Sequence, residues 1–201
     1  MRSSLAVLLA LALSAFAAPV ADVDVEARQT PCADVSVYFA RGTSESGTIG
    51  TSVGPQFKAA LEATLTGKSV DFVGVPYPAT VGGFLAGGDS GGATTMANLV
   101  TTKANSCAST KIVISGFSQG AQVVHLAAAK MTTAIQNRVD AAVVFGDPKK
   151  GQPFAGVINS RAITFCNAAD NICAGGIIIS PAHNYAAVSI PSSTHLFAAK
   201  A

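Results

Sequence analysis

Ser118 lies in the pentapeptide Gly-Phe-Ser-Gln-Gly, residues 116–120, which fits the pattern G-x-S-x-G. The run Lys-Ile-Val-Ile-Ser at 111–115 predicts a strand before it, and the alanine-rich residues 119–131 predict a helix after it. On such a sharp turn the serine hydroxyl is pushed out of the sheet, and flanking glycines are needed because the strand and helix backbones approach closely. The first N–H groups of the helix and the positive end of its dipole face any negative charge that develops there. The pattern therefore predicts Ser118 as a nucleophile.

Around this turn, β-rich runs alternate with helical stretches. Further strands are predicted at 35–40, 70–75, 139–145 and 162–165, and further helices at about 54–65, 93–105 and 192–199. The glycine-dominated residues 82–92 predict a loop. This alternation is typical of an α/β fold, with a mainly parallel sheet covered by helices on both faces. No repeat or linker divides the chain.

The amino-terminal residues predict a secreted protein. A positive start at Met1-Arg2 precedes an apolar run at 5–16, which is shorter than the roughly 20 residues of a membrane span. With Ala-Phe-Ala ending at residue 17, the pattern is that of a signal peptide over 1–17. The acidic residues 18–28 end in a single arginine and are expected to be a pro-segment. Residues 29–201 then form the one domain.

Composition narrows the class of partner. The net charge is only +2 and the basic residues are scattered, which argues against nucleic-acid binding. Charged residues make up 12% of the chain, against a usual share of about 25%. No later apolar segment is long enough to span a membrane. We therefore expect a secreted protein, monomeric by default, that works on apolar material.

The four cysteines, Cys32, Cys107, Cys166 and Cys173, all follow the predicted signal peptide, so two disulfides are expected in an oxidising compartment. Three pairings are possible, and the short spacing within the last two favours a small closed loop there. The chain has no C-x-x-C, and no histidine stands at a ligand spacing from a thiol. No metal or cofactor is expected.

A serine nucleophile needs a base, and three histidines are available. His125 lies seven residues beyond Ser118 on the same predicted helix, about 10 Å along its axis, which is too far to touch the hydroxyl. His195 falls in the predicted carboxyl-terminal helix. His183 follows a loop after the last predicted strand, and the chain order of serine, acid and histidine favours it as the base.

Three aspartates are candidates for the acid that orients the histidine. Asp140 begins a strand, at the end of the sheet opposite the expected site, because ligands gather at the carboxyl ends of parallel strands. Asp147 follows the fourth predicted strand and is a competitor. Asp170 follows the fifth and lies between the two closely spaced cysteines, so a disulfide would fix its loop. We favour Asp170 as the acid that holds the tautomer of His183.

These motifs together resemble the cutinase family, which includes fungal cutinases, related acetylxylan esterases and mycobacterial cutinase-like proteins. The resemblance covers nearly the whole chain after the pro-segment and rests on the segments 41–45 (Arg-Gly-Thr-Ser-Glu), 116–120, 166–173 and 181–185 (Pro-Ala-His-Asn-Tyr). It implies an α/β-hydrolase fold, a three-layer sandwich with a five-stranded parallel sheet and no lid domain. One departure is Ala182, since the family's loop more often runs Pro-His directly.

The resemblance also implies roles for individual residues. It pairs Cys32 with Cys107 and Cys166 with Cys173, and it implies the triad of Ser118, His183 and Asp170. Two further residues, Thr43 and Gln119, would form the oxyanion hole, through the backbone N–H of Gln119 and through Thr43, whose hydroxyl adds a donor.

The expected activity is that of a serine esterase that hydrolyses cutin and short-chain esters through an acyl-enzyme. Substrate would contact Leu85, in a loop at 81–89, and Ile177 and Ile178, in a loop at 175–181. The run of three isoleucines at 177–179 is either a buried strand-like segment or an exposed apolar rim. An acetylxylan esterase with a narrow polar cleft is the alternative. A secreted protein that kept the fold without catalysis is a rival of another class.

Overall fold

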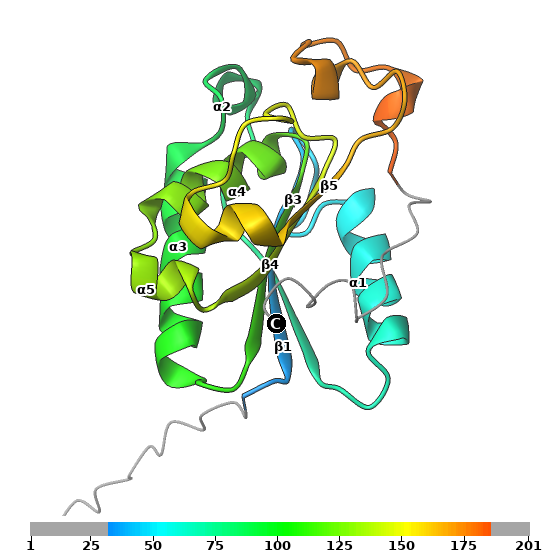
Figure 1. Cartoon of the computed structure of the whole chain (residues 1–201). Coiled ribbons are helices and arrows are strands. Elements are labelled where there is room, and N and C mark those ends of the chain that lie inside the picture. Colours follow the sequence, from blue (N-terminus) through cyan, green and yellow to red (C-terminus); the bar gives the residue numbers. More distant parts are fainter. Residues whose placement is uncertain (1–31, 186–201) are drawn as a thin grey trace, which may run out of the picture. The chain divides into compact units, whose positions relative to one another are not determined.

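The computed structural model describes residues 32–185, and within them five strands form one sheet (Figure 1). The strands are β1 (Val35–Ala40), β2 (Val70–Gly74), β3 (Lys111–Phe117), β4 (Val139–Phe145) and β5 (Ala162–Phe165). They lie in the order β2-β1-β3-β4-β5, and all four neighbouring pairs are parallel. This is the five-stranded parallel sheet that the resemblance implied. The loops after the strands therefore gather at one edge, with the turn after the central β3 among them.

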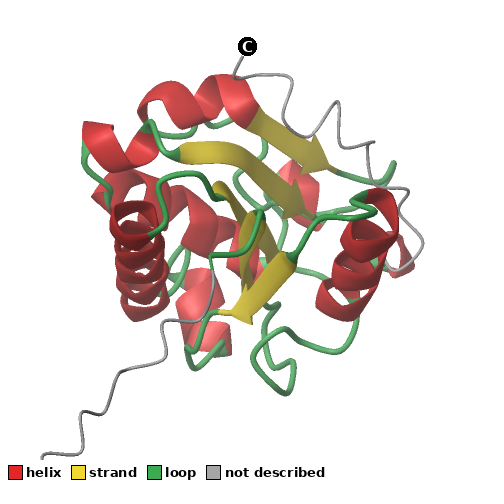
Figure 2. Cartoon of the chain, turned by 90° about the horizontal axis from the view of Figure 1, so that it is seen from below, coloured by secondary structure: helices red, strands yellow, loops and turns green. Residues whose placement is uncertain are grey.

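Helices cover both faces of this sheet, which gives the expected three layers (Figure 2). The α-helices are α1 (Val53–Thr64), α2 (Val81–Leu85), α3 (Ser90–Ser106), α4 (Gln119–Lys130) and α5 (Thr133–Gln136). Three short 3₁₀ helices are η1 (Gly156–Arg161), η2 (Ile172–Ala174) and η3 (Pro181–His183). No helix within the described residues is long and apolar enough to cross a membrane.

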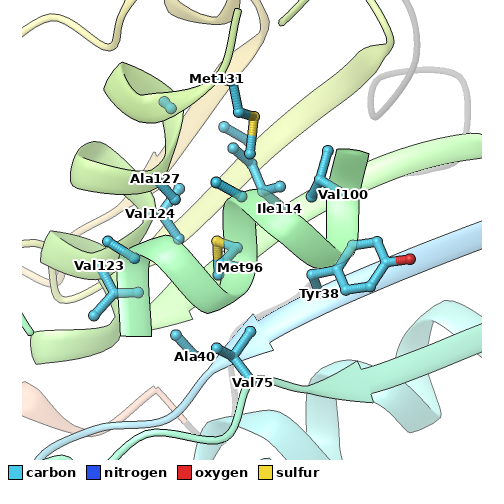
Figure 3. Close-up of a cluster of buried hydrophobic side chains, with 14 of the residues drawn as sticks. Tyr38, Ala40, Val75, Met96, Val100, Ile114, Val123, Val124, Ala127 and Met131 are labelled. Atoms are coloured by element: carbon cyan, nitrogen blue, oxygen red, sulfur yellow. The ribbon is translucent and has the colours of Figure 1, made fainter. Parts of the chain in front are cut away.

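On one face, α3 and α4 pack against the centre of the sheet (Figure 3). Met96 and Val100 of α3 meet Val124 and Ala127 of α4, and Ile114 of β3 lies in the same buried cluster. Small alanine side chains let α4 approach β3 closely. The helix that follows Ser118 is thereby fixed to the strand that precedes it.

The other face carries α1, whose predicted apolar side is buried. Phe57 and Leu61 are each 1% exposed, and Leu65, just past the helix, is 6% exposed. Phe57 contacts Phe145 of β4, with ring centroids 5.3 Å apart and the rings edge to face. The predicted helix at about 54–65 is therefore confirmed.

Two helix starts differ from the sequence prediction. Helix α3 begins at Ser90, before the expected residue 93, because the Asp89 side chain accepts the N–H of Gly92 at 2.6 Å and caps the helix. Helix α2 lies in a stretch that was predicted mostly as loop. Thr80 caps it by accepting the N–H of Gly83 at 3.0 Å, so the glycines there begin a helical turn.

Two disulfides join Cys32 to Cys107 and Cys166 to Cys173. The second closes the short loop that follows β5. The predicted signal peptide at 1–17, the pro-segment at 18–28 and the helix at 192–199 lie outside the described residues.

Candidate active site

Ser118 sits on a strained turn between β3 and α4. Its φ is 56° and its ψ −119°, a left-handed backbone that non-glycine residues rarely adopt. A Cβ at Gly116 would collide with the backbone of Gly120, and one at Gly120 would collide with the carbonyl group of Ala40. Both positions thus require glycine because neighbouring backbone lies too close for a side chain, as the pentapeptide pattern predicts. The N–H of Ser118 donates to the carbonyl of Phe145 at 2.9 Å, which ties the turn to β4.

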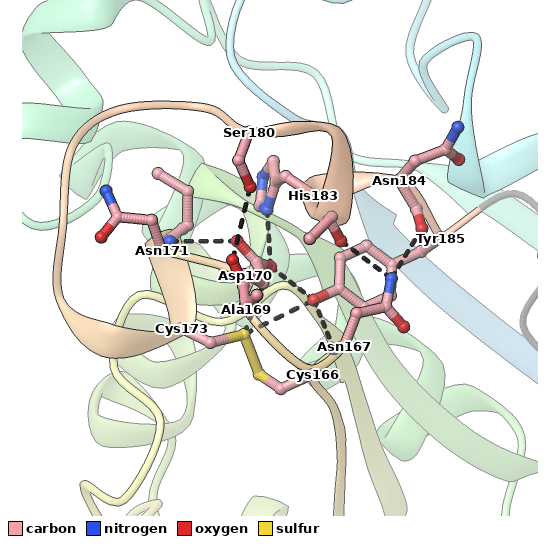
Figure 4. A network of polar contacts seen from close by, with 12 residues as sticks. Cys166, Asn167, Ala169, Asp170, Asn171, Cys173, Ser180, His183, Asn184 and Tyr185 are labelled. Atoms are coloured by element: carbon pink, nitrogen blue, oxygen red, sulfur yellow. Dashed lines mark hydrogen bonds and ion pairs between the residues drawn. A yellow bond between two sulfur atoms is a disulfide. The ribbon is translucent and has the colours of Figure 1, made fainter.

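His183 and Asp170 form a buried pair in the loops after β5 (Figure 4). Nδ1 of His183 lies 2.8 Å from Oδ2 of Asp170, and the two side chains are 3% and 0% exposed. Oδ1 of Asp170 accepts the backbone N–H of Ile172 at 3.0 Å. Burial opposes ionisation of Asp170, but the hydrogen bonds from Tyr185 and His183 outweigh it and lower the pKa of the carboxyl group. An ionised Asp170 holds the proton of His183 on Nδ1 and leaves the lone pair on Nε2.

The candidate base His183 packs against residues at the ends of β3 and β4. The ring of Phe117, the residue before Ser118, stacks on the His183 imidazole at a centroid distance of 4.9 Å. Gly146 lies against the same imidazole, and a Cβ there would be 2.9 Å from Nδ1. Among residues 32–185, Nε2 of His183 is buried and has no hydrogen-bond partner, Ser118 included. Catalytic hydrogen bonds of this kind often form only when substrate is bound.

The competing acids and bases lie elsewhere in the structure. Asp147 pairs with His125, with Oδ2 2.9 Å from Nε2 and side chains 1% and 7% exposed. Asp140 accepts the backbone N–H of Ile112 at 2.8 Å, at the start of β3 and far from its carboxyl end. Of the three aspartates, Asp170 is the one that the structure places against His183. His195 lies outside the described residues.

Thr43 and Gln119 also lie together. The side-chain amide of Gln119 donates to Oγ1 of Thr43 at 3.0 Å and to the carbonyl of Thr80 at 2.6 Å. Gln119 is the first residue of α4, so its backbone N–H has no partner within the helix. The backbone N–H of Gln119 and the hydroxyl of Thr43 therefore both lie near the turn that carries Ser118.

The candidate substrate contacts are exposed and apolar. Leu85 is 62% exposed, and Ile177, Ile178 and Ile179 are 67%, 72% and 69% exposed. These isoleucines lie in no strand, so the buried strand-like alternative was wrong. Leu85 and Ile177 line a hollow of about 180 Å³ whose wall includes Gln122, one turn into α4.

Three residues with roles in holding the site were not singled out from the sequence. Asn167 donates its side-chain amide to the carbonyls of Ala182 and Asn184, at 2.9 and 2.7 Å, and so holds the backbone on both sides of His183. Tyr185 donates to Asp170. Glu45 is the third.

Glu45 organises the loop that carries Thr43. Its carboxylate accepts the backbone N–H groups of Gly42, Thr51 and Ser52 at 2.7, 3.1 and 3.0 Å. Both Glu45 and Tyr185 stand inside the segments 41–45 and 181–185 that carry the family resemblance. Their position in these segments could have marked them as candidate site residues. Their hydrogen-bond partners could not be predicted, because the fold brings those partners together.

A parallel sheet, a strained serine between its central strand and a helix, and a buried His–Asp pair define a hydrolase of the α/β-hydrolase type. A family model described as Cutinase matches residues 31–200. The chain is 50% identical over 175 residues to a cutinase of Botryotinia fuckeliana, covering 87% of this chain and 85% of that protein. It is 53% identical over 173 residues to cutinase CUT1 of Coprinopsis cinerea, covering 86% and 85%.

The solved structure of a Trichoderma reesei cutinase in complex with a phosphonate inhibitor is similar as well. It has a TM-score of 0.74 and 40% identity, over 84% of this chain and 74% of that one. This chain belongs to the cutinase family.

Proposed function

We propose that this chain is a secreted serine esterase that hydrolyses cutin and short-chain esters through an acyl-enzyme. The observation that carries the proposal is Ser118 on its strained turn next to Phe117, whose ring stacks on the imidazole of the buried His183–Asp170 pair. Secretion is supported by the two disulfides, which persist in oxidising compartments.

In the proposed mechanism, Oγ of Ser118 attacks the ester carbonyl carbon and its proton passes to Nε2 of His183. The tetrahedral intermediate collapses as the carbon–oxygen bond to the leaving alcohol breaks and His183 returns the proton to that alcohol. Water then attacks the acyl-enzyme with the same base, which releases the acid and restores Ser118. Asp170 stays ionised and stabilises the imidazolium.

The developing oxyanion would rest on the backbone N–H of Gln119 and on Thr43. Because the Gln119 amide donates to Oγ1 of Thr43, the hydroxyl proton of Thr43 is left free to donate in turn. Loss of one such donor typically costs about 3 kcal/mol of barrier.

The exposed side chains of Leu85, Ile177 and Ile178 favour a polyester or lipid-like substrate over a polysaccharide. An acetylxylan esterase is expected to have a narrow polar cleft, whereas these three large apolar side chains are exposed, which supports an apolar substrate. With no covering lid domain expected, soluble esters should be hydrolysed without interfacial activation.

The proposal is tested by comparing the wild type with Ser118→Ala. We expect the wild type to hydrolyse p-nitrophenyl butyrate faster than the acetate and palmitate, and to release hydroxy acids from cutin. The variant should lose about 10⁶-fold in kcat. Activity confined to acetyl esters and acetylated xylan would move the assignment to an acetylxylan esterase. If the wild type is inactive on all of these esters, the proposed activity is wrong and only the fold assignment remains.

A further inference from the structure

The phenol of Tyr185 contacts the acid of the candidate triad directly. Its hydroxyl donates to Oδ2 of Asp170, the same oxygen that lies 2.8 Å from Nδ1 of His183. In turn, the phenol oxygen accepts the backbone N–H of Asn167 at 3.0 Å. Figure 4 shows these contacts converging on the phenol oxygen of Tyr185. One oxygen of the carboxylate is therefore shared between the imidazole and the phenol.

The ring of Tyr185 is also fixed. Tyr185 is 2% exposed, and its ring stands edge to face against Phe117 and His183, with centroids 6.0 and 5.9 Å away. Phe145 lies on another side at 6.4 Å. Because Phe117 precedes Ser118, the same ring packs against the strand of the nucleophile and against the base. The hydroxyl thus reaches Asp170 from a rigid position.

We propose that Tyr185 is a positioning residue of the triad, which fixes the rotation of the Asp170 carboxylate and takes up part of the negative charge on Oδ2. The inference rests on the proposed function, since it assigns Tyr185 a part in the same reaction. Tyr185 acts through Asp170 and is not expected to touch the substrate. A carboxylate held in this way keeps His183 oriented. Its negative charge is shared between the hydrogen bond to the imidazole and the hydrogen bond from the phenol.

The electrostatics follow from the groups around Asp170. His183 and Tyr185 bond its carboxylate, Ile172 donates a backbone N–H, and Lys150 lines a hollow of about 780 Å³ alongside it. Burial, and then the bond to Asp170, raise the pKa of Tyr185, so the phenol stays a neutral donor.

Removing the hydroxyl of Tyr185 has two consequences, and both favour the protonated form of the Asp170–His183 pair. The pKa of Asp170 rises because a hydrogen bond to its charged form is lost. The charge that remains on Oδ2 then faces the imidazole alone and favours the protonated ring.

The test is Tyr185→Phe, which keeps the ring and removes only the hydroxyl. We expect kcat on p-nitrophenyl butyrate to fall about tenfold with KM unchanged, as for one lost hydrogen bond to a charged group. The acid limb of the kcat/KM profile, where the Asp170–His183 pair takes up a proton, should move about half a pH unit higher.

Tyr38→Phe is the matched control. It makes the same change at a buried tyrosine of β1, in the cluster on the α3 and α4 face, and should leave the acid limb in place. A lower melting temperature in Tyr185→Phe with an unmoved acid limb would show a structural role only and overturn the inference.

A second readout does not need esterase activity. The ring signals of His183 are followed by NMR over pH in the Ser118→Ala background, assigned by their loss in His183→Ala. Adding Tyr185→Phe should move the titration of His183 to higher pH, and an unchanged titration would refute the coupling. If the wild type is inactive on esters but Tyr185→Phe still shifts the titration of His183, the proposed function is wrong and the role of Tyr185 in orienting the pair stands.

Discussion

At the residue scale, the proposed oxyanion hole depends on the orientation of the Thr43 hydroxyl. Its hydroxyl oxygen accepts from the Gln119 amide, which leaves one proton to donate. The loop around it is held by the Glu45 carboxylate through the N–H groups of Gly42 and Ser52. A hydroxyl oriented before substrate arrives needs no reorganisation in the transition state.

Thr43→Val removes this hydroxyl and keeps the shape of the side chain. We expect kcat to fall about 100-fold on p-nitrophenyl butyrate with little change in KM, because the donor acts on the oxyanion and not on the bound ester. Thr43→Ser is the control, and it should stay within a few-fold of the wild type. Equal losses in both variants would instead point to the packing of the threonine methyl group.

At the scale of elements, the loop at 175–181 and helix α2 are expected to meet the polymer. Ile178 is 72% exposed, so its replacement by serine should not affect folding. Ile178→Ser should slow the release of acids from cutin particles several-fold and leave soluble p-nitrophenyl butyrate unaffected. The control is Ala63→Ser, which changes an exposed residue of α1, away from α2 and the loop at 175–181. An equal effect on soluble and particulate substrates would count against an apolar rim.

The elements that the sequence predicted well are those fixed by local pattern. The strand before Ser118 and helix α4 follow from a buried apolar run and a helix-forming stretch with glycines where backbones touch. Helix α2 was missed because glycine suggests a loop, whereas the Thr80 cap starts a helical turn. Tyr185 could not be assigned a role, because its partner Asp170 lies 15 residues away and is brought near only by folded loops.

At the scale of the whole molecule, two carboxylates with hydrogen-bonded partners lie beyond opposite ends of the parallel strands. Asp170 lies at the carboxyl edge. Asp34, just before β1, accepts the backbone N–H and hydroxyl of Ser69 before β2, each at 2.9 Å. Those two bonds, followed by that from Lys68, lower the pKa of Asp34 to about 2. Both groups are therefore more acidic in the folded chain than the value of about 3.9 expected when unfolded.

A carboxyl group whose pKa is lowered by folding stabilises the fold above its unfolded pKa and loses that effect as the pH falls through the folded value. The free energy of unfolding should thus decline between about pH 4 and pH 2, measured by urea titration at several pH values. Asp34→Asn should be less stable than the wild type at pH 6, and the difference should shrink towards pH 2, where Asp34 is protonated in the unfolded chain and half protonated in the folded one. A gap that stays constant across this range would mean that the bonds to Ser69 do not depend on the charge of Asp34.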